Sequence, residues 1–535
     1  MRRLISCVLA AAMMCGLVAC SGKDAGQAAS QEGKSQTADS EEAELKKNYT
    51  VSYDGVETGD VSSGAAVHDP SILAAEGAYY IYGSHMTAAK STDLLSWTKL
   101  ADGYSPSNPV YGQIYDDGVK EKAFAYAGMA SSRIKTDDGS THVWAPDVIY
   151  NKAAGKYYMY YCTTSTWKAS NLCYGISDSP EGPFAWQGAL IYSGYSLSEL
   201  EATDVLDYVD EDYVRDHYIK AGAYNYEDYP NAIDPAVFYD EDDRLWMVYG
   251  SWSGGIFLLE LDPQTGLVIH PEADPDRQVD PYYGKRLLGG GHISIEAPYI
   301  LYDEGSGYYY LFVSYGSLTS NGGYQIRVFR SETADGTYVD MNGAYPAKSA
   351  MHADYGLKLS GNYKLPSLER AYMATGHNSA FVDSDGKRYL VYHTRFNDGG
   401  ERHSPRVHQM FLNQNGWPVE LPYQTRQETI SESGYDTDTV TGRYYVVNQG
   451  TDISSDIANP IIVYLNADGT CEGREVSGTW GMESGTYYMS ITLDGETFDG
   501  VFCRMQDEAG KPVMSFSAVG QNESLWGVKY LEDEA

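Results

Sequence analysis

The amino-acid sequence predicts an all-β protein, a five-bladed β-propeller followed by a small C-terminal β-barrel or sandwich domain. Five hairpin-like repeats, a content of 55 glycines and 49 tyrosines among 535 residues, and sparse helical periodicity lead to this prediction. Short aromatic strands separated by turns are typical of propellers and barrels. A β-sandwich with coincidental hairpins is the alternative fold.

Each repeat begins with a polar or acidic residue beside proline or a small residue, and continues as an apolar strand, a turn and an aromatic strand. Spacings of roughly 60–90 residues suit blades with long insertions. The copies begin at His68-Asp69-Pro70-Ser71-Ile72, Trp144-Ala145-Pro146-Asp147-Val148, Ile233-Asp234-Pro235-Ala236-Val237, Glu296-Ala297-Pro298-Tyr299-Ile300 and Gly376-His377-Asn378-Ser379-Ala380. The innermost strand of every blade lines the propeller axis, so residues at one position of the repeat converge there.

The first residues carry the pattern of a bacterial lipoprotein signal. Arg2 and Arg3 precede an apolar stretch that ends directly before Cys20. We expect residues 1–19 to be removed and Cys20 to be lipidated; an ordinary cleaved secretory signal is the alternative. Residues 20–48 contain no aromatic residue and are expected to form a disordered tether. The protein is thus expected to be exported and surface-anchored, with the lipid as its only membrane contact.

Residues 49–426 are expected to form the propeller, and residues 427–535 the C-terminal β-domain. The second region has turn pairs such as Asp468-Gly469 and no recognisable catalytic constellation, so structural packing is favoured over independent sugar binding. Cys162 and Cys173 could form a disulfide or remain free buried thiols.

The chain is acidic, with 38 lysines and arginines against 74 aspartates and glutamates and a formal net charge of −36. Nucleic acid is excluded as a partner, because phosphate binding needs a basic surface. A neutral carbohydrate is the expected substrate class, and the protein is expected to be a monomer.

Carboxylates crowd the predicted axis. Aligned on the proline, Asp69 and Asp234 share one position, Glu296 lies one residue earlier, and His377 falls on the same position if Asn378 replaces the proline. Asp147 lies two residues later. Like charges at close range raise each other's pKa and cost stability, so such crowding is expected where acid and base roles must differ. Glycoside hydrolysis generally uses two carboxyl groups that face the scissile bond, one as the acid and one as the base or nucleophile.

The segments around Asp69, Trp144, Asp234 and Glu296 resemble family 43 glycoside hydrolases, which are five-bladed propellers. A narrower resemblance, to the two-domain endo-α-1,5-L-arabinanases of that family, is carried by Gly376-His377-Asn378-Ser379, His393-Thr394-Arg395-Phe396 and Arg406-Val407-His408-Gln409-Met410-Phe411. Together the motifs extend over residues 60–425.

The resemblance implies an inverting endo-arabinanase that cleaves internal α-1,5 bonds of arabinan. Asp69 would be the general base, Glu296 the general acid, and Asp234 the carboxylate that raises the pKa of the acid and orients it. Inversion predicts a separation of roughly 6.5–9.5 Å between the two catalytic carboxyl groups.

The resemblance also indicates binding residues. Trp144, Asp147, Ser251 and Trp252 are expected to bind substrate, although Trp144 could be a core residue and Asp147 could support the inner strand. His377 is expected to bind a metal ion on the axis, generally calcium, largely through water, because a hard cation prefers oxygen ligands.

Two other functions stay open. One is an exo-acting α-L-arabinofuranosidase or β-xylosidase with the same carboxylates and a groove closed at one end. The other is a noncatalytic glycan-binding surface lipoprotein. A basic cluster, which is formed by Arg395, Arg402, His403, Arg406 and His408, is expected mainly to pair with the acidic body.

Overall fold

The computed structural model describes residues 47–346 and 352–531. Nearly all of the described residues belong to one compact unit, which begins at Tyr49. The predicted signal at 1–19, the predicted lipidation site Cys20 and nearly all of the predicted tether lie outside the described residues. Within the described part, no helix is both long and apolar enough to cross a membrane.

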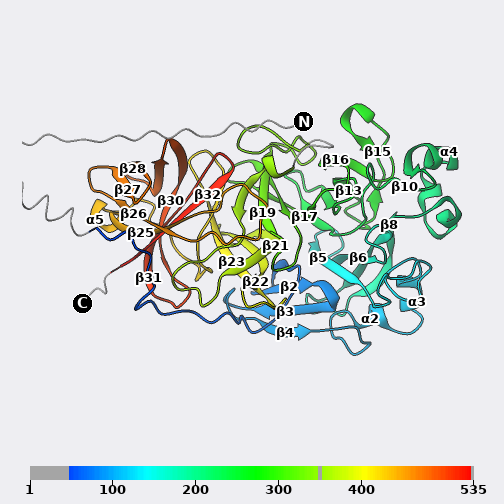
Figure 1. Ribbon diagram of the computed structural model, residues 1–535. Coiled ribbons are helices and arrows are strands. Elements are labelled where there is room, and N and C mark those ends of the chain that lie inside the picture. The colour runs from blue at the N-terminus through cyan, green and yellow to red at the C-terminus, as the bar shows by residue number, and fades with distance from the viewer. Residues whose placement is uncertain (1–46, 347–351, 532–535) are drawn as a thin grey trace, which may run out of the picture. The chain divides into compact units, whose positions relative to one another are not determined.

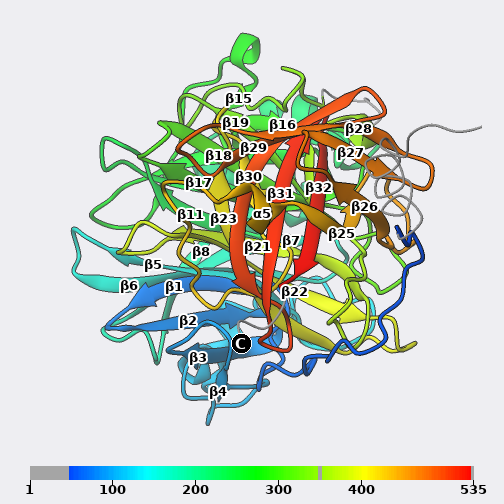
Figure 2. The ribbon, with the colours of Figure 1, turned by 90° about the vertical axis from the view of Figure 1, so that its left-hand side faces the viewer.

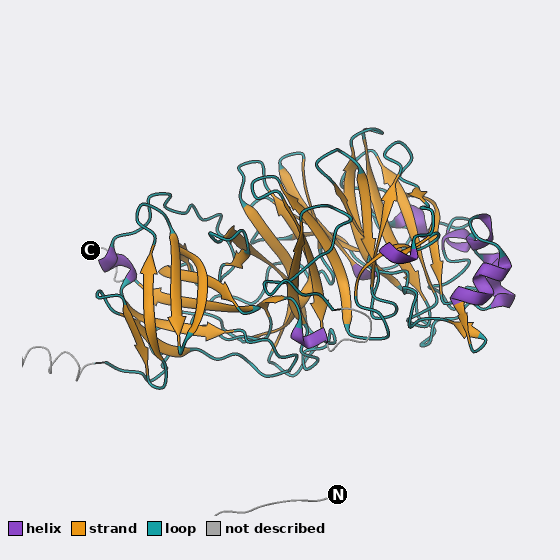
Figure 3. Ribbon diagram, turned by 90° about the horizontal axis from the view of Figure 1, so that it is seen from above, coloured by secondary structure: helices purple, strands orange, loops and turns teal. Residues whose placement is uncertain are grey.

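Five antiparallel sheets, each with four main strands, form the blades of a propeller (Figures 1 and 3). Blade 1 contains β1 (Ser71–Ala75), β2 (Ala78–Gly83), β3 (Thr87–Ser91) and β4 (Thr98–Ala101). Blade 2 contains β5 (Val143–Asn151), β6 (Lys156–Thr164), β7 (Ser170–Ser177) and β8 (Ala185–Ser193). Blade 3 contains β11 (Ala236–Tyr239), β12 (Leu245–Tyr249), β13 (Ile256–Leu261) and β16 (Gly284–Leu288), with β14 (Val268–Ile269) and β15 (Val279–Asp280) added at its edge.

The last two blades follow the same order. Blade 4 contains β17 (Ile295–Asp303), β18 (Tyr308–Tyr315), β19 (Gln325–Ser331) and β20 (Leu357–Ser360). Blade 5 contains β21 (Tyr372–Val382), β22 (Arg388–Phe396), β23 (His403–Leu412) and β24 (Pro418–Glu420). The prediction of a five-bladed propeller is confirmed.

In residues 47–346 and 352–531, the helices are short and confined to connections. They are α2 (Gly112–Tyr115), α3 (Lys120–Ala123), α4 (Glu211–Tyr213), α5 (Thr437–Val440), η1 (Ser84–Met86), η2 (Leu197–Ala202), η3 (Val205–Asp207), η4 (Val214–Tyr218), η5 (Pro275–Arg277) and η6 (His352–Asp354). The connection between blades 2 and 3 also carries the small hairpin of β9 (Ile219–Lys220) and β10 (Ala223–Tyr224).

The aromatic second strands are buried on both faces because each blade packs between two others. Tyr80, Tyr160 and Tyr249 are almost completely buried. Burial of such a side chain contributes roughly 1.5–3 kcal/mol. One apolar cluster joins Ile81 of blade 1 to Val391 of blade 5, and this contact closes the ring.

The inner strands share an unusual backbone turn at their start. The residue before the proline has a positive φ in four blades: 54° at Asp69, 42° at Ala145, 55° at Asp234 and 56° at Ala297. His377 has φ 22° in blade 5, where Asn378 replaces the proline. Such backbone costs on the order of 1–3 kcal/mol per residue and is concentrated at functional sites. Because the blades share this turn, aligning the repeats on the proline matches structurally equivalent residues.

The C-terminal strands close into an eight-stranded antiparallel barrel, in which β25 pairs with β32 (Figure 2). Apolar side chains that include Trp480, Phe502 and Phe516 fill its interior. The strands are β25 (Gly442–Asn448), β26 (Ile461–Leu465), β27 (Thr470–Gly473), β28 (Ser477–Met482), β29 (Tyr488–Leu493), β30 (Glu496–Gln506), β31 (Pro512–Gly520) and β32 (Glu523–Tyr530). Of the two predicted forms, barrel and sandwich, the barrel is present.

The barrel is joined to the propeller by hydrogen bonds. The carboxylate of Glu508, in the turn between β30 and β31, accepts from Tyr372 and, at 2.7 Å, from Gln424 Nε2. On blade 4, Gln325 Nε2 donates to the carbonyl oxygen of Asp452 at 2.9 Å. Cys162, Cys173, Cys471 and Cys503 are free buried thiols, so the Cys162–Cys173 disulfide is not formed.

Candidate active site

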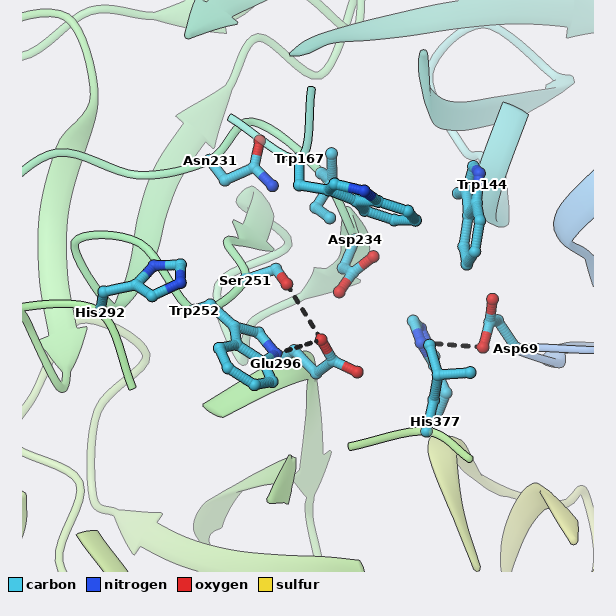
Figure 4. A pocket seen from close by; sticks show the side chains of 12 residues that line it. Asp69, Trp144, Trp167, Asn231, Asp234, Ser251, Trp252, His292, Glu296 and His377 are labelled. Atoms are coloured by element: carbon cyan, nitrogen blue, oxygen red, sulfur yellow. Dashed lines mark hydrogen bonds and ion pairs between the residues drawn. The ribbon is translucent and has the colours of Figure 1, made fainter. Parts of the chain in front are cut away.

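The five blades enclose a pocket of about 350 Å³ at the end of the propeller where the inner strands begin and the second strands end. Figure 4 shows its side chains. It is lined by Asp69, Trp144, Trp167, Asn231, Ile233, Asp234, Ser251, Trp252, His292, Glu296, Leu318 and His377. The structure therefore brings together all three predicted catalytic carboxylates, the predicted metal ligand and three of the four predicted substrate-binding residues.

Asp69 is held among histidine rings and a hydroxyl group. Its Oδ1 lies 3.3 Å from Nδ1 of His377, its Oδ2 lies 2.7 Å from Nδ1 of His68, and the Ser84 hydroxyl donates to Oδ2. Burial alone would raise its pKa, but the charge interactions with His68 and His377 outweigh burial and hold the pKa well below the usual range. Asp69 is therefore a carboxylate across the neutral range, as a base must be.

Glu296 and Asp234 form a second, coupled pair of carboxyl groups. One oxygen of Glu296, Oε2, accepts hydrogen bonds from Ser251 Oγ at 3.1 Å and from Trp252 Nε1 at 2.8 Å. Asp234 accepts from the backbone N–H of Ala297 at 3.2 Å. Burial raises the pKa of both groups, and the charge of Glu296 further raises the pKa of Asp234. The pair thus retains a proton to higher pH than ordinary carboxyl groups do.

Tyr324 contacts this pair and was not singled out from the sequence. Its buried hydroxyl is hydrogen-bonded to Glu296, which favours the ionised form of that carboxyl group. A Cβ atom on Gly376 would lie 2.4 Å from the Tyr324 ring, so the glycine of Gly376-His377-Asn378 is needed for the tyrosine to fit. Tyr324 immediately precedes β19, outside the repeated segments, so the repeat alignment could not reveal it.

Two tryptophans form an aromatic wall of the pocket. The rings of Trp144 and Trp167 meet edge to face, with centroids 5.3 Å apart, and the Trp167 side chain is 49% exposed. Trp144 lines the pocket and also packs against the apolar cluster behind it. Trp167 lies in the turn between β6 and β7. Its sequence signal is an aromatic residue in a polar turn after a second strand, the same location as Trp252 after β12.

Asp147 does not line the pocket, and its assignment to substrate binding is corrected. Its carboxylate accepts from the hydroxyl of Ser71 and, at 2.7 Å, from the backbone N–H of Val237. It thereby joins the inner strands of blades 1, 2 and 3. Burial raises the pKa of Asp147 to about 6. The alternative prediction, support of the inner strand, describes its position.

The histidines beside Asp69 bear on the predicted metal site. The ligand atoms of His68, Asp69 and His393 lie within 4.8 Å of one another. However, His68 Nε2 accepts from Arg395 Nη2 at 3.0 Å, and His393 Nδ1 accepts from the backbone N–H of Asp69 at 3.2 Å. Because these two lone pairs are used, the three residues do not form a ready metal site in this arrangement.

His377 offers a better fit to a cation. Its Nδ1 faces Asp69, which leaves Nε2 as the ring nitrogen that can act as a ligand. Calcium takes six to eight oxygen ligands. One imidazole nitrogen and nearby carboxylates fit such an ion only if water supplies most of its coordination.

Comparison with known proteins agrees with this site. Residues 122–418 match glycosyl hydrolases family 43, and residues 422–527 match the C-terminal lipocalin-like domain found with that family. Extracellular endo-alpha-(1->5)-L-arabinanase 2 of Bacillus subtilis is 39% identical over 87% of this chain and 93% of its own length. Extracellular endo-alpha-(1->5)-L-arabinanase of Thermotoga petrophila is 37% identical over 88% of this chain and 94% of its own length.

Solved structures give the same result. The crystal structure of the Thermotoga petrophila endo-1,5-alpha-L-arabinanase matches with a TM-score of 0.75 at 35% identity, over 89% of this chain and all of that one. A family 43 glycoside hydrolase of Bacillus licheniformis also matches with a TM-score of 0.75, at 38% identity over 88% of this chain and 99% of that one. The chain therefore belongs to glycosyl hydrolase family 43.

Proposed function

We propose that this protein is an inverting endo-arabinanase that hydrolyses internal α-1,5-L-arabinofuranosidic bonds of arabinan. The observation that carries the proposal is the meeting of Asp69, Asp234 and Glu296 in one pocket, in surroundings that lower the pKa of the first and raise those of the other two. When the pKa of one carboxyl group is lowered and that of another is raised, the first can act as a base and the second as an acid at the same pH. The endo-arabinanases to which the chain is 37–39% identical support the choice of substrate.

In the proposed reaction, Asp69 accepts a proton from water as the water oxygen bonds to the anomeric carbon. Glu296 donates its proton to the glycosidic oxygen as the bond between that oxygen and the anomeric carbon breaks. Attack opposite the leaving group inverts the anomeric centre. Asp234 and Glu296 are coupled, so a negative charge on Asp234 favours the protonated form of Glu296. The Ser251 and Trp252 hydrogen bonds hold the acid in place.

The pocket suits an uncharged sugar chain. Trp144 and Trp167 present flat aromatic faces beside the carboxylates, and such faces pack well against the apolar side of a sugar ring. The acidic chain, with a net charge of −36, would repel a polyanion, whereas arabinan is neutral.

Product size tests the endo assignment. Linear, debranched arabinan is expected to yield a range of arabino-oligosaccharides from the first time points, which chromatography of the products would follow. Release of arabinose alone from the outset would favour the exo-acting alternative. Binding of arabinan without hydrolysis would favour the noncatalytic alternative.

We also propose that His377 binds calcium through Nε2, largely with water as the other ligands. A cation there would supply positive charge near the ionised form of Asp69. Isothermal titration of chelator-treated protein with calcium is expected to show one site, which is lost in His377→Ala, and calcium is expected to restore activity lost to the chelator. Unchanged calcium binding by His377→Ala would contradict this assignment. The matched control is His217→Ala, at an exposed histidine of η4.

Export is supported by the relatives from Bacillus subtilis and Thermotoga petrophila, both of which are named extracellular. We propose that the chain is exported as a monomer and that lipid on Cys20 attaches it to the cell surface.

A further inference from the structure

Arg395, near the end of β22, connects three parts of the active-site face. It is 4% exposed, and its guanidinium donates from Nε to the carbonyl oxygen of Leu318 at 2.7 Å and from Nη1 to the carbonyl oxygen of Glu401. Its third contact, Nη2 to Nε2 of His68, measures 3.0 Å. Leu318 lines the pocket, and His68 is the residue before Asp69. The predicted role of this arginine, pairing with the acidic body, accounts only for its ion pair with Glu401.

The contact with Arg395 fixes where the proton of His68 resides. A guanidinium group has donors only, so Nε2 of His68 must be an acceptor with a free lone pair. A neutral imidazole with a lone pair on Nε2 carries its hydrogen on Nδ1. Nδ1 is the atom that lies 2.7 Å from Oδ2 of Asp69. The hydrogen therefore lies on the nitrogen next to the carboxylate, although the N–H is not aligned for a hydrogen bond to it. In the other tautomer, a lone pair would lie beside the negative charge.

Two other histidine rings pack against the ring of His68. It stacks on His393 with ring centroids 4.2 Å apart at 27°, and it meets His403 edge to face at 5.1 Å. His393 in turn accepts from the backbone N–H of Asp69 at 3.2 Å. The ring position is thus fixed by packing, and its tautomer is fixed by Arg395.

We propose that Arg395 is a positioning residue for the reaction, because it holds His68 in the Nδ1–H tautomer that places an N–H group, rather than a lone pair, next to the carboxylate of Asp69. The inference rests on the proposed function, in which Asp69 is the base. Arg395 touches neither substrate nor water in this scheme and acts through His68. Lysine is not expected to replace Arg395, because a single ammonium group cannot reach the acceptors of Leu318, Glu401 and His68 in three directions.

The tautomer can be observed directly. Long-range ¹H–¹⁵N correlation spectra of histidine-labelled protein distinguish protonated from unprotonated ring nitrogens, and the His68 signals among the 11 histidines are those absent from His68→Asn. We expect Nδ1 of His68 to be protonated in the unaltered protein. In Arg395→Met, we expect the proton to move to Nε2 or to be distributed over both nitrogens. A proton on Nε2 in the unaltered protein, or spectra unaffected by Arg395→Met, would overturn the proposal.

A double-mutant cycle separates this role from a merely structural one. Arg395→Met is expected to lower kcat on the order of 10- to 100-fold with little change in KM. His68→Asn retains an amide that can donate to Asp69 but lacks the Nε2 acceptor. Adding Arg395→Met to His68→Asn should therefore lower kcat by no more than about twofold. If the arginine served only to hold the loops of Leu318 and Glu401, its loss would cost the same in both backgrounds.

The matched control is Arg402→Met, four residues from Asp398 in the turn after β22. Arg402 is exposed and pairs with Asp398 at 2.9 Å, and its loss is expected to leave kcat and the His68 spectrum unchanged. Failure of the proposed function would be visible separately, because Asp69→Asn would then remain active whatever the tautomer of His68. An inactive Asp69→Asn together with an Nε2-protonated His68 would overturn only the role of Arg395.

Discussion

Glu296→Gln is expected to lower kcat on arabinan by about 10²–10⁴-fold, the usual contribution of a general acid. Glutamine has nearly the same shape and can still accept from Ser251 and Trp252, so the pocket should keep its form and KM should change little. What is lost is the proton that the leaving oxygen needs. Steady-state kinetics on linear arabinan would measure the effect.

The leaving group provides the control for this assignment. An aryl arabino-oligosaccharide whose phenol leaves without protonation should restore much of the activity of Glu296→Gln but not that of Asp69→Asn, which lacks the base. Glu241→Gln, the same change on the exposed turn between β11 and β12, should behave as the unaltered protein. Undiminished hydrolysis of arabinan by Glu296→Gln would remove the acid role from this residue.

The repeat allowed the fold and much of the site to be predicted, because the inner strands start with the same backbone turn. Positive φ values at Asp69, Asp234 and His377 place these residues at one position of three blades, although more than 300 residues separate the first from the last. Proline and its neighbour are visible in the sequence, so their register could be read. The propeller then brings that position to one pocket in every blade.

The same reasoning failed where the strand departs from regular alternation. β5 has its register shift between Trp144 and Asp147, and β17 has the corresponding shift between Glu296 and Tyr299. Asp147 therefore lies on the strand side of the shift, whereas Glu296 lies on the pocket side, and the residue types alone do not show this difference. Trp167, Tyr324 and His292 were missed for a different reason, since they lie between strands, where the repeat imposes no common position.

Asp234→Asn is expected to shift the alkaline limb of the pH profile of kcat/KM to lower pH, by about one unit or more. That limb reports loss of the proton from the acid in the free enzyme. Tyr324, Ser251 and Trp252 all donate to Glu296, and these bonds favour its carboxylate form. Burial and the negative charge of Asp69 oppose them and raise the pKa of Glu296. The charge interaction with Glu296 that raises the pKa of Asp234 acts in both directions, so an ionised Asp234 adds to this effect. Without the charge of Asp234, the balance moves toward the carboxylate, so the proton is lost at lower pH.

The acid limb should stay in place, because it reports Asp69, whose pKa is lowered mainly by His68 and His377 rather than by Asp234. Asparagine can still accept from the N–H of Ala297, so the backbone turn should persist. A fall of one unit in the pKa of Glu296 destabilises its protonated form by about 1.4 kcal/mol. At a pH above both the original and the lowered pKa, the rate then falls about tenfold. An alkaline limb that stays or moves upward would show that Asp234 does not raise the pKa of Glu296. If Asp234→Asn instead lost activity at every pH and regained it with the aryl leaving group, then Asp234 would itself be the proton donor.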